Sequence, residues 1–289
     1  MWLLGHLPEG FARFCSSLLD VGLPRLRRTA MLNLTFAYPE KSDEDRRRIG
    51  DGVFRSIGRL LYAFARFPRI TKSNAGEWIR YEGLEHYLDA KKQGKGVMVA
   101  TAHLGNWELS AFAHALMTEP MNIVIRRLDH AGADRLVEAR RQLSGNRLIE
   151  KHEAARTILR VLAQNEAVGV LIDQNTSLQE GVFVNFFGRQ ASASAAFVRF
   201  AARTGAAAIP GFALWNETEQ RYVLRFYPAI PMTGDIAADA QRLHSVLESV
   251  IREYPDQWLW IHRRWKTQPP IVGRGPCPAA GPPAGLPGA

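Results

Sequence analysis

One short segment of this sequence places a histidine and a carboxylate at a spacing that suits acid–base chemistry. His103 follows an apolar run at residues 97–100, and Glu108 comes five positions later. Histidine titrates near neutrality and is suited to take the proton of a hydroxyl group, while a nearby carboxylate can fix its tautomer and stabilise the imidazolium. We therefore expect His103 to act as a general base that Glu108 orients. The pair alone is equally compatible with a structural histidine.

The residues around this pair predict a strand that runs into a helix. The apolar, partly β-branched segment at 97–101 is typical of a buried strand, and a helical pattern of apolar residues begins at Trp107. Loops at this position in α/β proteins present chemical groups on a rigid scaffold. We expect the backbone N–H groups at the start of the helix to be available to an oxyanion.

A second polar cluster follows another apolar segment. Asp173, Gln174 and Asn175 come directly after residues 168–172, which are typical of a buried strand. Polar groups at the carboxyl end of such a strand lie where α/β sheets bind their ligands. A helix cap or a turn would also explain the cluster. Two strands that each end in polar residues nevertheless favour one shared site.

Other clusters are compatible either with substrate binding or with ordinary packing. An aromatic segment bounded by glycines, residues 181–189, is expected to line an acyl groove or to pack in the core. Residues 255–266 mix aromatic and cationic side chains, which suits a lipid interface, stacking on nucleic acid or a packed terminal helix. Six arginines form either a phosphate-binding or carrier-binding surface or a solvated helix face: Arg126, Arg127, Arg135, Arg140, Arg141 and Arg147.

The pattern of apolar residues predicts three regions. Residues 1–70 are expected to be helical, residues 71–268 to form an α/β domain, and the Pro-, Gly- and Ala-rich residues 269–289 to be disordered. The alternation of strands and helices predicts a mixed central sheet flanked by helices, because the last two strands read as a hairpin. The expected strands are 97–101, 122–126, 147–149, 167–172, 207–214 and 222–227, and the expected helices are 83–93, 107–117, 133–144, 153–164, 192–204 and 235–253.

Composition and charge narrow the class of protein. The chain has 289 residues, 46% of them hydrophobic, and a net charge of +9, which favours anionic partners. Its two cysteines, Cys15 and Cys277, predict neither a disulfide framework nor a metal site. Nucleic acid is disfavoured as a partner because the sequence has no zinc-finger, basic-zipper or ribonucleoprotein motif. A serine-hydrolase elbow, a Walker loop and a zinc-protease motif are absent as well.

The beginning of the chain suggests contact with a membrane surface. Residues 2–23 are apolar but interrupted by charges, and Arg25, Arg27 and Arg28 follow them. This order fits an amphipathic helix at a lipid interface, or an ordinary helix that packs on the core. No apolar stretch reaches the roughly 18 residues that a membrane-spanning helix needs.

In their order along the chain, these motifs resemble the bacterial lipid A biosynthesis acyltransferases, and more widely the glycerolipid acyltransferases. The resemblance covers about residues 4–266, and its early matching segments are 28–39 and 82–85. The family's His-x4-acid motif corresponds to His103 and Glu108, its central arginine to Arg141, and its Asp-Gln pair to Asp173 and Gln174. Its last two elements correspond to Phe186, Phe187 and Gly188, and to Trp260, His262, Arg263 and Arg264. This chain departs from the pattern at Asn185 and Gln190, where relatives often carry proline.

The resemblance implies a fold and a reaction. The fold is expected to be glycerolipid acyltransferase-like, and the reaction to move a fatty acyl chain from an acyl-carrier protein or coenzyme A thioester to a hydroxyl or hydroxyacyl group of a membrane glycolipid, foremost a lipid A precursor. His103 and Glu108 would be catalytic, and Arg141, Asp173 and Gln174 would hold the oxyanion or the substrate. No metal and no resident cofactor are implied. The protein is expected on the cytoplasmic face of the inner membrane, peripheral or weakly anchored.

Three alternatives stay open at this point. The same motifs occur in acyltransferases that act on phosphatidylinositol mannosides. A thioesterase or phospholipase would use the same residues with water as the nucleophile. The chain could also be a non-catalytic basic protein that binds membranes.

Overall fold

The computed structural model describes residues 24–151 and 154–270, together with residues 10 and 22. Within these residues the chain forms a seven-stranded sheet in the order β1-β9-β8-β2-β5-β3-β4. All neighbouring strands are parallel except β8 and β9, which form an antiparallel hairpin. The prediction of a mixed sheet with a hairpin near its end is therefore confirmed. The strands are β1 (Ile79–Glu82), β2 (Val97–Thr101), β3 (Asn122–Ile125), β4 (Arg147–Glu150), β5 (Ala167–Leu171), β8 (Ala207–Asn216) and β9 (Arg221–Phe226).

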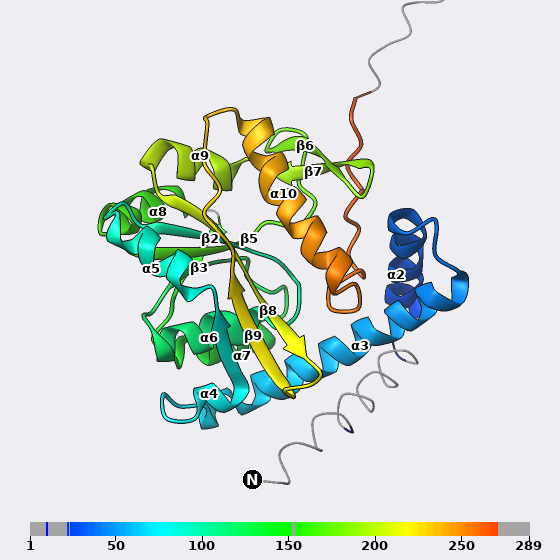
Figure 1. The fold of residues 1–289 in the computed structure, drawn as a ribbon, viewed down its shortest axis with the longest axis horizontal. Coiled ribbons are helices and arrows are strands. Elements are labelled where there is room, and N and C mark those ends of the chain that lie inside the picture. Colours follow the sequence, from blue (N-terminus) through cyan, green and yellow to red (C-terminus); the bar gives the residue numbers. More distant parts are fainter. Residues whose placement is uncertain (1–9, 11–21, 23, 152–153, 271–289) are drawn as a thin grey trace, which may run out of the picture.

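Helices cover both faces of this sheet (Figure 1). Met98 and Ala100 of β2 belong to a core cluster with residues of α8 (Ala154–Ala163), α9 (Ala196–Thr204) and α10 (Ile236–Glu253). Val97 and Val99, which point to the other face, belong to a second cluster with residues of α5 (Leu84–Lys92) and α6 (Trp107–Met117). The apolar run in β2 thus reflects a strand that is buried on both sides.

The described part of the N-terminal region is helical, as predicted. It forms α2 (Pro24–Ala37) and the long α3 (Asp43–Arg66), followed by a short 3-10 helix at Phe67–Arg69 and by α4 (Ala75–Trp78). Ser42 caps α3 by accepting a hydrogen bond from the N–H of Asp45. None of the helices within the described residues is long and apolar enough to cross a membrane. The predicted interfacial segment before Pro24 and nearly all of the predicted disordered tail lie outside the described residues.

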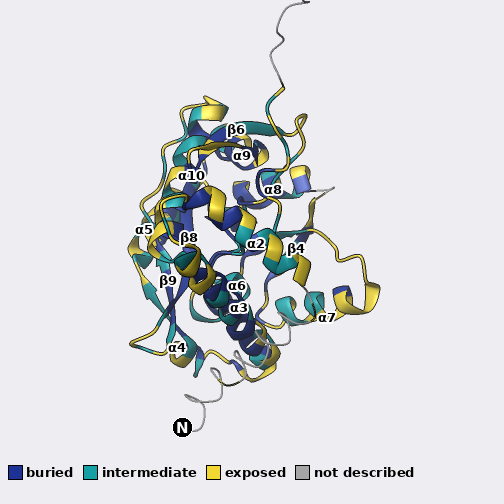
Figure 2. Ribbon diagram, turned by 90° about the vertical axis from the view of Figure 1, so that its right-hand side faces the viewer, coloured by how far each residue is buried: buried dark blue, intermediate teal, exposed yellow. Residues whose placement is uncertain are grey.

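The remaining helix, α7 (Ala131–Gln142), projects from the body of the molecule (Figure 2). Asp134 is its one buried residue. The helix connects the carboxyl end of β3 to the amino end of β4.

The prediction was wrong for the segment at 181–194. The structure has a separate antiparallel hairpin here, β6 (Gly181–Phe186) and β7 (Arg189–Ser194), which is absent from the expected strands. Phe187 and Gly188 make its two-residue turn, with φ values of 55° and 71°. Gly188 adopts its positive φ at no steric cost. The predicted helix at 192–204 consequently begins later, at Ala196. The short edge strand β1 was also missed, because four residues carry little periodicity.

Candidate active site

The two polar clusters that follow β2 and β5 meet at the carboxyl edge of the sheet. The two strands are parallel neighbours, and Thr101 lies opposite Leu171 in their register. His103 and Asp173 each come two residues later, so the register brings them together. His103 Nδ1 lies 2.9 Å from Asp173 Oδ1 in a hydrogen bond. The structure therefore places the two clusters side by side, as their positions after strands suggested.

Asp173 is fully buried, and each oxygen of its carboxylate makes a hydrogen bond with His103. Its Oδ2 accepts hydrogen bonds from the backbone N–H of His103 at 3.0 Å and from the indole N–H of Trp258 at 2.9 Å. Because an ionised carboxylate only accepts, Nδ1 of His103 carries the proton of their shared hydrogen bond. This leaves a lone pair on Nε2, the other ring nitrogen, which is the atom able to take a proton from a substrate.

Electrostatics favour an ionised Asp173 beside a basic His103. Burial by itself would lower the pKa of His103, but the charge and hydrogen bond of Asp173, with a further contribution from Glu108, raise that pKa above its ordinary value. Burial would raise the pKa of Asp173, yet the charge and hydrogen bond of His103 and the nearby His262 and Trp258 hold it well below the usual range. The geometry is that of a histidine base supported by a carboxylate.

The expectation that Glu108 orients His103 is wrong. Asp173 has that place, and Glu108 is engaged by Arg141 on α7 in a two-pronged ion pair, with Nε–Oε2 and Nη2–Oε1 distances of 2.8 and 2.5 Å. The indole N–H of Trp107 also donates to Glu108, at 3.2 Å. Glu108 therefore positions the Arg141 cation beside His103. It affects the pKa of His103 only through the electrostatic effect of its charge.

A C-terminal segment fixes the loop that carries His103. The N–H of Leu259 donates to the carbonyl of His103, and the N–H of Gly105 donates to the carbonyl of Gln257, both at 2.9 Å. Gly105 has a φ of +61°, and a Cβ there would lie 1.9 Å from the carbonyl oxygen of Ala213. Only glycine fits this close approach. The turn is therefore rigid, which suits a base that must keep one orientation.

The backbone amides of this turn were expected to be available to an oxyanion, and three of them are not. The N–H of His103 is bound to Asp173, that of Gly105 to Gln257 and that of Asn106 to Ala213. Asn106 instead caps α6 through its side chain, which accepts from the N–H of Leu109. Arg141 is a cation with a donor to spare beside the site, because its Nη1 makes no hydrogen bond to a described residue.

The site opens into a cavity of about 800 Å³. His103, Glu108, Arg141 and Gln174 line it, and Gln174 is exposed at its mouth. Its deeper lining is apolar and comes from both faces of the sheet: Val99, Met121, Ile123 and Phe226 on the α6 side, and Ile158, Val170, Phe197 and Phe200 on the α8–α9 side. A long apolar group reaching His103 therefore has room to be buried.

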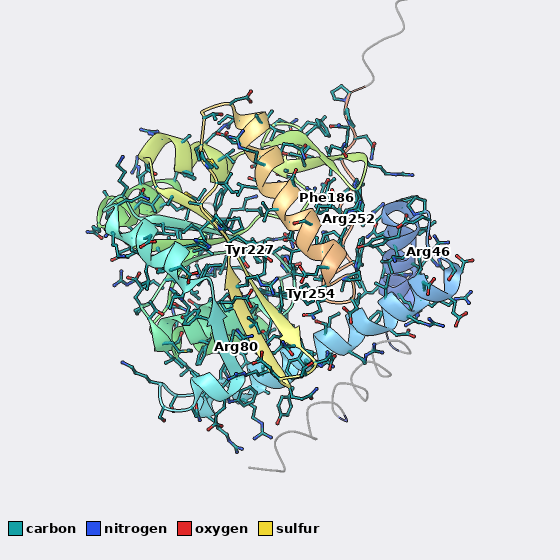
Figure 3. All side chains as sticks on the ribbon, in the orientation of Figure 1. Arg46, Arg80, Phe186, Tyr227, Arg252 and Tyr254 are labelled. Atoms are coloured by element: carbon teal, nitrogen blue, oxygen red, sulfur yellow. The ribbon has the colours of Figure 1, made fainter. Side chains whose placement is uncertain are left out.

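The Phe-Phe-Gly element does not line this cavity, contrary to the expectation of an acyl groove there. Phe186 is fully buried and packs on Trp258 with ring centroids 5.7 Å apart. Phe187 packs on Trp260 and beneath the guanidinium of Arg252, which Figure 3 shows on the same side of the molecule as Phe186. Phe186 and Phe187 therefore pack the β6–β7 hairpin against the core, and Gly188 lies in its turn.

The six central arginines do not form one anion-binding surface. Arg127 pairs with Glu150, Arg141 with Glu108 and Arg147 with Glu166, while Arg140 donates to two carbonyls at the end of α3. Arg126 and Arg135 are exposed to solvent, and Arg126 pairs with the exposed Asp129. A run of charges in sequence thus separates into local contacts within the protein and a solvent-exposed residue, Arg135.

Sequence reasoning missed Trp258 as a partner of Asp173, although it lies in the aromatic segment singled out at 255–266. The sequence showed only that this segment is rich in aromatic residues. It does not indicate which strand end the indole of Trp258 contacts, because that contact depends on the tertiary fold. Two other matching residues of that segment, Trp260 and Arg264, are structural. Trp260 and Arg264 are fully buried, and Arg264 donates to the carbonyl of Ser192 in β7.

An α/β sheet with a carboxylate-supported histidine at its carboxyl edge, open to an apolar cavity, defines an enzyme of the acyl-transfer type. The chain belongs to the bacterial lipid A biosynthesis acyltransferase family, whose sequence model matches residues 1–267. It is similar to the lipid A biosynthesis lauroyltransferase of Escherichia coli, with 26% identity over 93% of this chain and 90% of the relative. It is also similar to the palmitoleoyltransferase of that organism, with 27% identity over 93% and 89%. A lipid A biosynthesis acyltransferase of Haemophilus influenzae is 23% identical over 84% and 76%.

Proposed function

We propose that this chain transfers a fatty acyl group from an acyl thioester to a hydroxyl or hydroxyacyl group of a lipid A precursor, with His103 as the general base. The observation that carries the proposal is the His103–Asp173 pair, which leaves Nε2 of the imidazole without a proton at an apolar cavity. The relatives are lauroyl, palmitoleoyl and myristoyl transferases of lipid A biosynthesis, which favours this acceptor over a phosphatidylinositol mannoside and favours transfer over a non-catalytic role.

In the proposed mechanism the acceptor hydroxyl gives its proton to Nε2 of His103 as its oxygen attacks the thioester carbonyl. Asp173 stabilises the imidazolium that forms, and Nη1 of Arg141 faces the tetrahedral oxyanion. The carbon–sulfur bond then breaks, and the imidazolium returns the proton to the leaving thiolate. General-base catalysis of this kind contributes about 10²–10⁴-fold. The acceptor is itself the nucleophile, so the reaction needs no acyl-enzyme.

The donor is an acyl-carrier protein or coenzyme A thioester, and its acyl chain would occupy the apolar part of the cavity. The polar groups at the mouth, Arg141 and Gln174, are suited to hold the carbonyl and the acceptor's polar head. Neither role requires a metal or a resident cofactor.

We further propose that the protein lies on the cytoplasmic face of the inner membrane through the rim of this cavity. Four exposed leucines lie on α7, directly after it, or in segments that contribute to the cavity lining, and together they are the rim leucines: Leu128, Leu136, Leu143 and Leu178. Arg126 and Arg135 stand among them in solvent. Apolar side chains mixed with cations suit an anionic lipid interface, where a glycolipid acceptor would enter directly.

The proposal is tested by His103→Ala, which should lower kcat by about 10²–10⁴-fold while the fold is retained. The assay uses a lauroyl thioester with a lipid A precursor and analyses products with and without the acceptor by mass spectrometry. His86→Ala on α5, where the imidazole lies away from the cavity, is the matched control. Transfer by His103→Ala at the rate of the unaltered protein would contradict the mechanism, and release of free fatty acid alone would show hydrolysis instead of transfer.

A further inference from the structure

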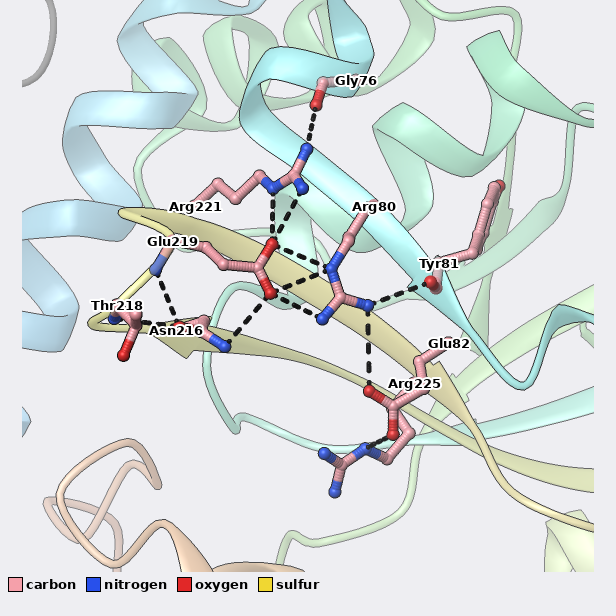
Figure 4. A network of polar contacts seen from close by, with 9 residues as sticks. All are labelled: Gly76, Arg80, Tyr81, Glu82, Asn216, Thr218, Glu219, Arg221 and Arg225. Carbon is pink, nitrogen blue, oxygen red and sulfur yellow. Dashed lines mark hydrogen bonds and ion pairs between the residues drawn. The ribbon is translucent and has the colours of Figure 1, made fainter.

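Many arginines that could attract a partner are already paired with carboxylates within the protein. At the edge formed by β1 and β9, Glu219 accepts hydrogen bonds from Arg80 and Arg221, and Glu82 forms an ion pair with Arg225 (Figure 4). Such clusters are internally neutralised and offer little attraction to an outside anion.

Four arginines on α8 and α9 differ from this pattern. Arg156 and Arg160 lie one turn apart on α8, and Arg199 and Arg203 lie one turn apart on α9. All four are exposed, and none forms an ion pair with a described carboxylate. The two helices contain no acidic residue within the bounds Ala154–Ala163 and Ala196–Thr204. We call these four residues the α8–α9 patch.

The four side chains share one outer surface. The buried residues of each helix, among them Ile158 on α8 and Ala201 on α9, face the sheet, and the arginines lie on the opposite side of each helix. The helices pack side by side on the same face of the sheet (Figure 1). The patch is therefore a compact, positively charged surface without an ion pair to any carboxylate in the part of the chain that the structure describes.

This field borders the cavity that contains His103. Arg199 belongs both to the patch and to the cavity lining. The exposed Lys151, which follows β4, also lines the cavity. A partner seated on the patch would thus lie beside an entrance to the cavity. Unlike the rim around α7, the patch contains no exposed large hydrophobic side chain. Charge without apolar anchors suits a soluble acidic protein better than a bilayer.

We infer that the α8–α9 patch is the docking surface for an acidic carrier protein that delivers the acyl thioester. The inference rests on the proposed function and adds to it the route of the donor: the carrier sits on α8 and α9 and passes its flexible thioester arm into the cavity beside Arg199. The acceptor lipid enters from the rim around α7. Donor and acceptor therefore reach His103 from different surfaces.

The test is the triple variant R156E/R160E/R203E, which leaves the cavity residue Arg199 in place. With lauroyl-acyl carrier protein as donor, kcat/KM should fall by about 10–10³-fold, mainly through KM, because electrostatic attraction and docking are lost. With lauroyl-pantetheine, which has the same thioester without the protein, kcat/KM should stay unchanged. The affinity of the unacylated carrier protein, measured separately, should fall with the variant and also with rising salt.

The matched control is R69E/K72E, which reverses two exposed cations near α4 at the other end of the molecule. It should behave like the unaltered protein with both donors. The charge-neutral variant R156Q/R160Q/R203Q separates folding from docking, because it should also lose carrier affinity while keeping its activity with lauroyl-pantetheine.

Two results would overturn the inference. One is an unchanged affinity of the triple variant for the carrier protein, with binding to phosphatidylglycerol vesicles lost instead, which would assign the patch to the membrane. The other is an equal loss with both donors in the charge-neutral variant. If the unaltered protein transferred from neither donor, the proposed function would fail, and the carrier affinity would still report on the patch.

Discussion

Asp173 is the residue on which the basicity of His103 depends most directly. His103 acts as a base only when neutral, so kcat/KM should fall as the pH drops through its raised pKa, above the ordinary value of 6.5. In Asp173→Asn the charge that raises this pKa is gone while burial still lowers it, so the acid limb of the pH profile should move to lower pH. The amide can also hold the wrong tautomer, so kcat should fall by about 10²–10⁴-fold.

Asp239 offers a matched control for this experiment. It is also fully buried, and its carboxylate accepts hydrogen bonds from Thr233 and Gly234 before α10, far from His103 in the chain. Asp239→Asn should lower the free energy of unfolding without moving the acid limb. An acid limb of Asp173→Asn at the pH of the unaltered protein would show that another group sets the pKa of His103.

At the scale of elements, α2 supports the segment that holds the catalytic turn. Asn33 is 6% exposed, and its amide donates to the carbonyls of Trp260 and His262 at 2.6 and 2.8 Å. Asn33→Ala leaves these buried carbonyls without their donor, so we expect a loss of about 1–3 kcal/mol in the free energy of unfolding, measured with denaturant. Thr35→Ala, exposed on the same helix, is the control. Equal stability of the two variants would contradict this role.

The elements also show what the sequence could and could not predict. The strands that carry His103 and Asp173 were predicted because each is a short apolar run with polar residues after it. The sequence also favoured one shared site, but it did not predict the direct contact between His103 and Asp173. Strands β2 and β5 are separated by two strands along the chain, and only the tertiary register aligns Thr101 with Leu171. For the same reason the nearer carboxylate in sequence, Glu108, was assigned the role that Asp173 has. The α8–α9 patch was detectable as arginines four residues apart on helices without acids.

For the whole molecule, the proposals assign two different surfaces to two partners: the rim leucines to the membrane and the α8–α9 patch to the carrier protein. We expect L136S/L143S/L178S, which leaves the cavity residue Leu128 in place, to bind phosphatidylglycerol vesicles on the order of 10²-fold more weakly, since burying each leucine contributes at least about 1 kcal/mol. Cosedimentation at fixed salt measures this, and affinity for the carrier protein should not change. The control L61S/L88S alters two exposed leucines on α3 and α5. If that control lost as much vesicle binding as the rim variant, the membrane would contact the protein without a preferred face.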